Sequence, residues 1–285
     1  MTQVEVEQLL ACVSQAMPIW RTYRAHPEHA KLYRDTAGEP VGLLVFTTNA
    51  FHPHALGMAV YAPAADLFPQ ILADAQKEAR RQHKDRLVTW EYRPFSAFTD
   101  WLLAQQGFAV WRETVMPTVQ LADITVSVAP TADLLTLADI QADPEMRTQL
   151  LAMSLADYRR VHAINPMADT TPQQWAQTVF LDVLPSAPLA LVRQNRVAAY
   201  TFPFEDDPGI LTFGWLGAVR AVDLWPLQAA QIRWARQQGM TGLSGEFDST
   251  DLLALATYRH WPFAPAPDYT MVGKNITLDG LTFTQ

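Results

Sequence analysis

The sequence of 285 residues has little cysteine, fewer basic than acidic residues and no long apolar run. Its one cysteine, Cys12, excludes an intramolecular disulfide and a zinc site made of several thiolates. The 21 lysines and arginines are outnumbered by 29 acidic residues, and the net charge of −8 would repel a nucleic acid backbone. Nucleic acid is therefore not expected as a partner.

Targeting signals are also missing from the sequence. No uninterrupted apolar run approaches the ~18 residues of a transmembrane helix. The N-terminal stretch MTQVEVEQLLACVSQAM alternates acidic and apolar residues, whereas a signal peptide begins with positive charge and continues with an apolar core. A single free thiol is typical of a reducing compartment. We therefore expect a soluble, cytoplasmic protein without a membrane partner.

The chain contains enough apolar residues for two cores, and its two halves resemble each other. Apolar residues make up 49% of the sequence, which excludes a largely disordered chain. Five segments of the first half recur in the same order roughly 156 residues later, which indicates a tandem repeat of one domain. They are PVGLLVFTT with RVAAYTFPF, DLFP with DLWP, ARRQ with ARQQ, WEYRPFSAF with GEFDSTDLL, and GFAVWRETVM with PFAPAPDYTM.

Each copy predicts the same order of strands and helices. A hairpin and a third strand are followed by an amphipathic helix, at 69–82 in the first copy and at 226–238 in the second, where Gly239 is suited to end it. A strand, a second helix and a final pair of strands come next, and further helices precede each copy. This order predicts an α/β (α+β) fold in which each copy is a mixed, mostly antiparallel sheet flanked by helices.

The second helix of the second copy carries the most specific pattern. In DLLALATYRHWPF (251–263), Asp251, Ala254 and Tyr258 precede a closing Phe263. With the element order, this pattern resembles the GNAT acetyltransferase superfamily, specifically its tandem members with two such domains in one chain. The resemblance implies an N-terminal GNAT-like domain at 1–123 and a C-terminal one at 124–285. Leu103 stands where the first copy would have its tyrosine, so activity is expected in the C-terminal copy and the N-terminal copy is expected to be degenerate.

The resemblance also implies acetyl-CoA as a co-substrate, bound at the turn after the third strand. The family uses a turn of the type Arg/Gln-x-x-Gly-x-Gly/Ala, in which backbone N–H groups and a helix N-terminus approach the pyrophosphate. In this chain Leu224 and Pro226 fall near the glycine positions, as do Leu67 and Pro69 in the first copy. The residues that the resemblance assigns to the cofactor are Gly217, Ala218 and Val219 at the strand end and Asp223, Leu224 and Trp225 in the turn.

Two interpretations of the Asp-Leu-Trp-Pro turn stay open. As a structural feature, an aspartate shortly before a proline is ordinary chemistry for starting a helix, and the apolar pair would pack beneath that helix. As a functional feature, it is a remodelled cofactor turn in which proline removes a donor and Asp223 repels phosphate. In that case the backbone of Ala218 and Val219 would still pair with the pantetheine arm as an added strand does.

Acyl transfer to an amine needs a base for the amine proton and an acid for the leaving thiolate. The resemblance makes Tyr258 the acid, and the alternative is a tyrosine whose ring fills the core. Glu246, near the end of the strand GLSGEF, is the candidate base. The alternative is a structural carboxylate, since Glu91 matches it in the first copy. Tyr158 and His162, in the helical segment before the second copy, are candidates on the acceptor side.

These patterns predict an acyl-CoA-dependent N-acyltransferase that moves an acetyl group to an amine of a small molecule or peptide. The alternative is a catalytically silent protein of the same fold that binds a small-molecule ligand or a partner protein. We expect a monomer or a homodimer. No metal site is assigned, because His52 and His54 have no carboxylate or thiolate beside them in the sequence.

Overall fold

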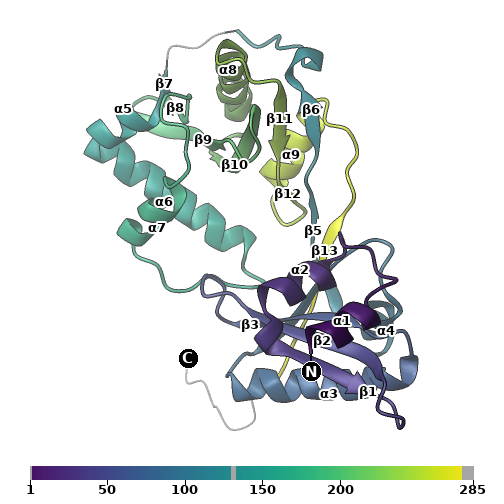
Figure 1. Ribbon diagram of the computed structural model, residues 1–285. Coiled ribbons are helices and arrows are strands. Elements are labelled where there is room, and N and C mark those ends of the chain that lie inside the picture. Colours follow the sequence, from purple (N-terminus) through teal and green to yellow (C-terminus); the bar gives the residue numbers. More distant parts are fainter. Residues whose placement is uncertain (1, 130–132, 278–285) are drawn as a thin grey trace. The chain divides into compact units, whose positions relative to one another are not determined.

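The computed structural model describes residues 2–129 and 133–277 of the chain (Figure 1). The chain divides into two units, and each is described by itself. Unit 1 comprises Met1–Glu113, Ile164–Ala168 and Asp268–Gln285, and unit 2 comprises Thr114–Ala163 and Asp169–Pro267. Within the described ranges, no helix has both the length and the apolar character needed to cross a membrane.

Unit 1 contains most of the first copy of the repeat. Its strands follow the order β1-β2-β3-β4-β13-β5 in a seven-stranded sheet, and β3 and β4 run parallel. The strands are β1 (Ala30–Arg34), β2 (Pro40–Thr48), β3 (Ala55–Tyr61), β4 (Arg86–Tyr92), β5 (Ala109–Val115) and β13 (Tyr269–Asn275). The helices are α1 (Gln3–Leu9), α2 (Pro18–Ala25), α3 (Phe68–Arg81) and α4 (Ala97–Gln105), with 3-10 turns η1 (Pro27–His29) and η2 (Ala65–Leu67).

Alternation along β2 gives unit 1 a core on each face of its sheet. Leu43 and Val45 pack with the apolar residues of α1 and α2, whereas Leu44 packs with those of α3 and α4. Successive side chains of a strand point to opposite faces, so helices must cover both faces to bury them. The predicted sheet with helices on both sides is confirmed for this unit.

Unit 2 contains most of the second copy. Its sheet has the order β6-β11-β10-β9-β8-β7, in which β10 and β11 run parallel. The strands of this sheet are β6 (Thr118–Gln120), β7 (Leu134–Leu135), β8 (Ala190–Arg193), β9 (Arg196–Phe204), β10 (Ile210–Ala218) and β11 (Gly242–Gly245). The short strand β12 (Phe247–Asp248) pairs instead with Thr114 and Val115 at the end of β5. The helices are α5 (Leu137–Ala142), α6 (Pro144–Val161), α7 (Pro172–Val179), α8 (Leu224–Gln237) and α9 (Leu252–His260), with 3-10 turns η3 (Leu121–Asp123) and η4 (Ala221–Asp223).

The helices of unit 2 also cover both faces of its sheet. Ile232 of α8 packs with Phe213 of β10 in one core, and α6 contacts β9 and β10 through other side chains. As predicted, α8 ends before Gly239, whose φ of 78° is accessible to glycine at little cost. Met240 N–H then donates to the Ala235 carbonyl oxygen at 3.0 Å, which closes the helix.

The last strand of each copy pairs with the sheet of the other copy. β13 pairs antiparallel with β4 from Tyr269 opposite Tyr92 to Asn275 opposite Arg86, and β6 pairs with β11. The units therefore differ from the contiguous ranges 1–123 and 124–285 expected from the sequence. Because the two copies share one strand order, β4 and β11 have equivalent free edges, and local sequence does not specify which edge a final strand will join.

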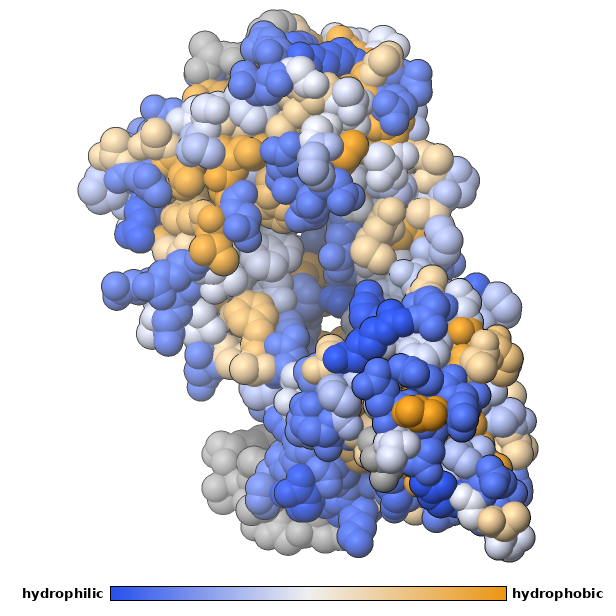
Figure 2. Space-filling model, viewed as in Figure 1, coloured by the Kyte–Doolittle hydropathy of each residue, from blue (hydrophilic) through white to orange (hydrophobic). Residues whose placement is uncertain are grey.

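Many of the large apolar side chains are buried. The largest fully buried side chains include Trp175, Tyr200, Phe98 and Phe202. On the face seen in Figure 2, hydrophobic residues gather over α5, β8 and β9, and hydrophilic residues cover much of the rest. Large apolar side chains thus fill the cores of the two units.

Candidate functional site

The strand β10 leaves its neighbour β11 partway along its length. The two strands pair in parallel over residues 210–213 of β10, which then continues beside β9 as far as Ala218. Val219 N–H donates to the Ala198 carbonyl oxygen of β9 at 2.8 Å. Because the N–H groups of a strand point alternately to its two sides, the N–H of Ala218 points to the side that β11 has left. This donor can pair with an added extended chain.

Gly217 brings a carboxylate and a phenol close to this part of β10. A Cβ atom on Gly217 would overlap Oδ2 of Asp157 and would lie 2.8 Å from Cζ of Tyr200, so the backbone approaches both groups as only glycine can. The Tyr200 hydroxyl donates to Asp157 Oδ2 at 3.2 Å, and Arg160 donates to Asp157 Oδ1 at 3.0 Å. Side chains from α6 and β9 therefore converge where β10 is open.

Asp251 adds a second carboxylate to this group. Its Oδ1 accepts the N–H groups of Leu253 and Ala254, at 2.9 and 3.3 Å, and so caps α9. Burial raises the pKa of Asp251, and the charge of Asp157 raises this pKa further. Burial also raises the pKa of Tyr200 well above its usual value, and both carboxylates add to that shift. We refer to Gly217, Asp157, Tyr200 and Asp251 as the Gly217 centre.

The Gly217 centre can take up and hold protons. Two carboxylates near one another disfavour being charged together, so one of them becomes the stronger base. A carboxyl with a raised pKa is suited to general acid–base catalysis because its pKa lies nearer the working pH. From the sequence, Gly217 was expected in the site, but Asp157 and Tyr200 were not. The available signal was a glycine inside an apolar strand, which marks close approach by another group.

The turn after β10 is closed by an ion pair. Arg220 donates from Nε and Nη2 to the two carboxylate oxygens of Asp223, both at 2.9 Å, and Asp223 is only 5% exposed. In η4, the N–H of Asp223 donates to the Arg220 carbonyl oxygen and the N–H of Leu224 to that of Ala221. Pro226 has no N–H. In this conformation these backbone groups are not available to a phosphate.

Arg220 offers a second way to align the turn with the family pattern. Counted from Arg220, the pattern Arg-x-x-Gly-x-Gly/Ala puts Asp223 and Trp225 at the glycine positions. The sequence placed Leu224 and Pro226 near these positions, and both frames stay predictions. Arg220 itself, the first residue of the pattern, was missed.

The two Asp-Leu-aromatic-Pro segments are alike in sequence but differ in structure. The helix α3 begins at Phe68 and α8 begins at Leu224, each directly after a 3-10 turn. By this alignment Asp223 corresponds to Leu67, and not to Asp66. In agreement, Asp66 is exposed whereas Asp223 is buried. The aspartate of the first copy therefore does not repeat the ion pair of the second.

Side chains also join α8 to α9. The ring of Trp225 stacks on His260, with ring centroids 4.0 Å apart and planes inclined by 7°, and burial lowers the pKa of His260. Deeper in the unit, Gln228 donates to Thr257 Oγ1 at 3.1 Å and accepts from Trp261 Nε1 at 2.9 Å. The two helices are thus held together next to the turn that the resemblance assigns to the cofactor.

Tyr258 and Glu246, the candidate acid and base, lie on α9 and between β11 and β12. The half-buried ring of Tyr258 is 5.6 Å from that of Phe247, and its hydroxyl has no hydrogen-bond partner within the described ranges. Glu246 is exposed. In the first copy Glu91 accepts both the N–H and the hydroxyl of Ser96 at 2.9 Å, a structural role at the start of α4. The roles of Tyr258 and Glu246 stay predictions.

Tyr158 and His162, the acceptor-side candidates, are part of a buried aromatic cluster. Their rings stack 3.9 Å apart, and they are only 7% and 9% exposed. The ring of Tyr158 also contacts Trp175 at 5.1 Å and Trp215 at 5.3 Å. Trp215, which is 39% exposed, is the member of this cluster that reaches the surface.

The first copy has a cavity where its own strands diverge. β3 pairs with β4 over residues 55–57 only, and a cavity of about 250 Å³ lies beyond, between the two strands and α2. Val60 and Trp90 are among its apolar walls. At its side the Tyr61 hydroxyl lies 3.5 Å from the Cys12 sulfur. The copy expected to be degenerate therefore retains a space of ligand size.

A group of metal-binding type lies on unit 1, among residues not singled out from the sequence. His26, Glu28 and His29 hold one ligand atom each within 4.8 Å of one another. Two imidazoles and a carboxylate form a donor set that zinc takes in proteins. The histidine considered from the sequence, His52, instead contacts the Asn165 carbonyl oxygen through Nδ1 at 2.8 Å. The overlooked signal was the His-x-Glu-His spacing.

Solved structures share this fold over most of the chain. A GCN5-related N-acetyltransferase from Sphaerobacter thermophilus matches with a TM-score of 0.56 and 12% identity, over 90% of this chain and 84% of that one. A tandem GNAT protein from the clavulanic acid biosynthesis pathway matches with a TM-score of 0.50 and 12% identity, over 95% and 94% of the two chains.

A third match is a glucosamine N-acetyltransferase region of a fungal multi-domain beta-N-acetylglucosaminidase, with a TM-score of 0.52 and 14% identity over 86% of this chain and 33% of that one. No protein-family model and no curated protein matches the sequence. Structural similarity at such low sequence identity shows the fold, whereas the function depends on the residues of the site. The chain is therefore a tandem GNAT-fold protein.

Proposed function

We propose that the protein is an N-acyltransferase that moves the acetyl group of acetyl-CoA to an amine of a small molecule or peptide, with the activity in the C-terminal copy. The observation that carries this proposal is the Gly217 centre, two carboxylates and a phenol at the open part of β10. Likeness of fold to N-acetyltransferases supports the reaction class. The single free thiol of Cys12 supports a cytoplasmic location. We further propose that the protein acts as a monomer or a homodimer.

The reaction moves one acyl group and two protons. The amine nitrogen attacks the thioester carbonyl carbon, the C–S bond breaks, the amine loses one proton and the leaving thiolate gains one. We assign the amine proton to Asp251, because burial raises the pKa of this carboxyl and so strengthens it as a base. Glu246 is the alternative base. Tyr258, whose hydroxyl has no protein partner in the described ranges, supplies the proton to the thiolate.

Acetyl-CoA fits the strand better than it fits the turn. Gly217, Ala218 and Val219 offer the amide-bearing arm an extended backbone beside which it can lie. At the turn, phosphate oxygens would replace the Asp223 carboxylate on Arg220, whose side chain is 67% exposed. Because the Asp223 side chain is only 7% exposed, this exchange of anions also requires its carboxylate to move out into solvent. Leu224 and Trp225 would then lie beside the phosphate bound to Arg220.

The same ion pair favours a second candidate function, ligand binding without acetyl transfer. Asp223 already occupies the Arg220 guanidinium in the bidentate manner that a phosphate would use. Trp225, stacked on His260, covers the start of α8. The cavity beside Trp90 in unit 1 would then serve as the ligand site, for a small molecule or for a side chain of a partner protein.

Calorimetric titration of acetyl-CoA and CoA separates the two functions. Wild type, Asp223→Gly and Asp66→Gly are compared, because Asp66 stands in the same motif of the first copy but is exposed. An acyltransferase should bind acetyl-CoA in the micromolar range, about −8 kcal/mol, and should release CoA when an amine is added. Binding gained only in Asp223→Gly would favour the second function. Absence of binding in all three proteins would contradict the acyltransferase.

The catalytic assignments are tested on the rate of CoA release. Asp251→Asn keeps the helix cap, because asparagine caps as well as aspartate, and should lower kcat/KM by roughly 10²- to 10⁴-fold if Asp251 is the base. Glu246→Gln is the matched test of the alternative base. Tyr258→Phe should lower the rate, and a rate unchanged across pH would show that Tyr258 is not the acid.

A further inference from the structure

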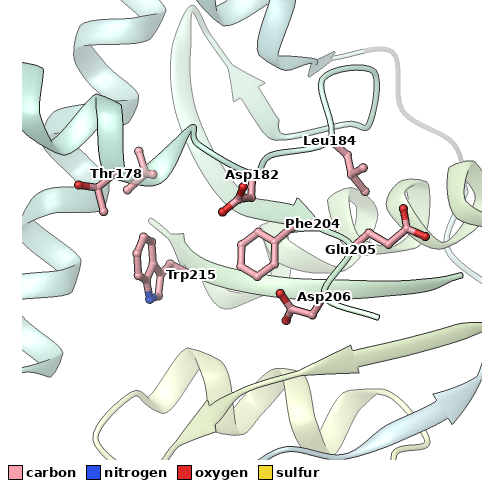
Figure 3. A pocket seen from close by; sticks show the side chains of 8 residues that line it. Thr178, Asp182, Leu184, Phe204, Glu205, Asp206 and Trp215 are labelled. Carbon is pink, nitrogen blue, oxygen red and sulfur yellow. The ribbon is translucent and has the colours of Figure 1, made fainter. Parts of the chain in front are cut away.

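A cavity of about 500 Å³ opens beside Trp215 in unit 2 (Figure 3). It lies between the end of α7, the loop that follows α7, the end of β9 and β10. Its walls include Asp182 from the loop, Phe204 and Asp206 from the end of β9 and the turn that follows, and Trp215 from β10. We term it the Trp215 cavity.

Two aromatic rings form the apolar part of this cavity. Trp215 is held in place by a stack on the fully buried Trp175, with centroids 5.4 Å apart, and by an edge contact with Tyr158. The Trp175 ring is itself fixed, since its Nε1 donates to Ser154 Oγ at 2.9 Å. A rigid, 39% exposed indole next to the half-buried Phe204 ring gives a ligand an apolar and cation-accepting surface.

The charged part of the cavity is wholly acidic. Figure 3 shows Asp182 and Asp206 on opposite sides of the Phe204 ring. Within the described ranges, neither carboxylate has an ion pair or a side-chain hydrogen bond, and no lysine or arginine lines the cavity. Glu205 differs, because its carboxylate accepts the N–H of Gly209 at 2.6 Å within the hairpin. Two separate carboxylates therefore remain for a cationic ligand.

The Trp215 cavity and the Gly217 centre share one face of β10. Trp215 contacts Tyr158 of α6, and Gly217 lies against the preceding residue of the same helix, Asp157. Two residues along an extended strand span about 7 Å. A ligand held in the cavity could thus extend a second group to the centre through a chain of a few methylene groups.

We propose that the Trp215 cavity binds one protonated end of an aliphatic diamine or polyamine, and that the other amino group reaches the Gly217 centre. The ammonium group lies between Asp182 and Asp206, and the methylene chain covers the Trp215 ring. The binding is inferred from the cavity alone, whereas delivery of an amine to acetyl-CoA rests on the proposed function. This assignment narrows the acceptor from any amine to an aliphatic dication.

Binding is tested by calorimetry without acetyl-CoA, using 1,5-diaminopentane, spermidine, pentylamine and 1,5-pentanediol. We expect the diamine and spermidine to bind more tightly than pentylamine and the diol not to bind. Asp182→Asn and Asp206→Asn should each weaken the diamine by about threefold, and the double variant by about tenfold, as expected for exposed charge pairs. Asp207→Asn, on the same hairpin but outside the cavity, is the matched control and should stay within about twofold of wild type.

The outcomes separate this inference from the proposed function. Absence of diamine binding, equal binding of the diol, or an equal loss in Asp207→Asn would overturn the assignment of the cavity. If one of these outcomes occurs while acetyl-CoA binding and CoA release are retained, the protein is an acyltransferase with another acceptor. Diamine binding without CoA release would support the cavity and contradict the transferase. Thermal unfolding of each variant confirms that it is folded.

Discussion

Replacement of Gly217 by alanine tests the close packing at the Gly217 centre. The new Cβ would overlap both Asp157 Oδ2 and Tyr200 Cε1, whereas ordinary contact begins at 3.4 Å. Because the backbones of β9 and β10 are held by strand pairing, relief has to come from the two side chains, which breaks the hydrogen bond between them. We expect the free energy of unfolding to fall by about 1–3 kcal/mol, the usual cost of overpacking.

A double-mutant cycle identifies the cause of this loss. Urea unfolding is followed by circular dichroism for wild type, Gly217→Ala, Asp157→Ala and the double variant. Since Asp157→Ala removes one of the two overlapping groups, the double variant should lose less stability than the two single variants together, by about 0.5–3 kcal/mol. Val219→Ala, at an exposed position two residues away, should stay within about 0.5 kcal/mol of wild type.

Two results would refute this reasoning. A Gly217→Ala protein as stable as Val219→Ala would mean that the backbone accommodates the methyl group without moving Asp157 or Tyr200. Strictly additive losses in the cycle would mean that the alanine acts elsewhere, for example through backbone conformation.

Three further predictions concern other parts of the chain. Burial raises the pKa of Asp251, so above the usual aspartate pKa the folded state binds more protons than the unfolded state, and stability falls as pH rises. This part of the fall should disappear in Asp251→Asn. Wild-type urea midpoints that do not change between about pH 4 and 7 would contradict the prediction. Gln228→Leu leaves Trp261 Nε1 and Thr257 Oγ1 without their partner and should lower the free energy of urea unfolding by about 2–4 kcal/mol. A loss below about 1 kcal/mol would mean that the two groups find other partners. Deletion of residues 268–285 removes β13 from the edge of β4, so hydrogen exchange should speed up in β4 more than in β9, and equal acceleration would argue against the strand exchange.

Local patterns in the sequence predicted much of the fold. The hydrophobic periods of 69–82 and 226–238 correspond to α3 and α8, and Gly239 follows α8 at positive φ as expected. These features depend on residues within a few positions of each other, so a single sequence carries them. The repeat of one element order also predicted the tandem fold that the solved structures share.

The candidate site was predicted only in part. Gly217 and Asp223 were assigned to the cofactor from the resemblance, but the bidentate pairing of Asp223 with Arg220 was not expected. The hydrogen bond from Tyr200 to Asp157 joins residues 43 apart in the chain, and no local pattern connects them. Burial, which raises the pKa of Asp251, is likewise a property of the folded unit.

By itself, the sequence determined the repeat, the order of strands and helices and the acidic, single-cysteine character of the chain, because these depend on composition and short-range periodicity. Tertiary structure alone decided that β13 joins the first sheet and β6 the second, since equivalent free edges compete for a final strand over distances that local preference cannot encode. It also decided that Asp157 and Tyr200 lie against Gly217 and that Asp251 interacts with both, because only packing of α6, β9 and α9 against β10 brings these distant residues together.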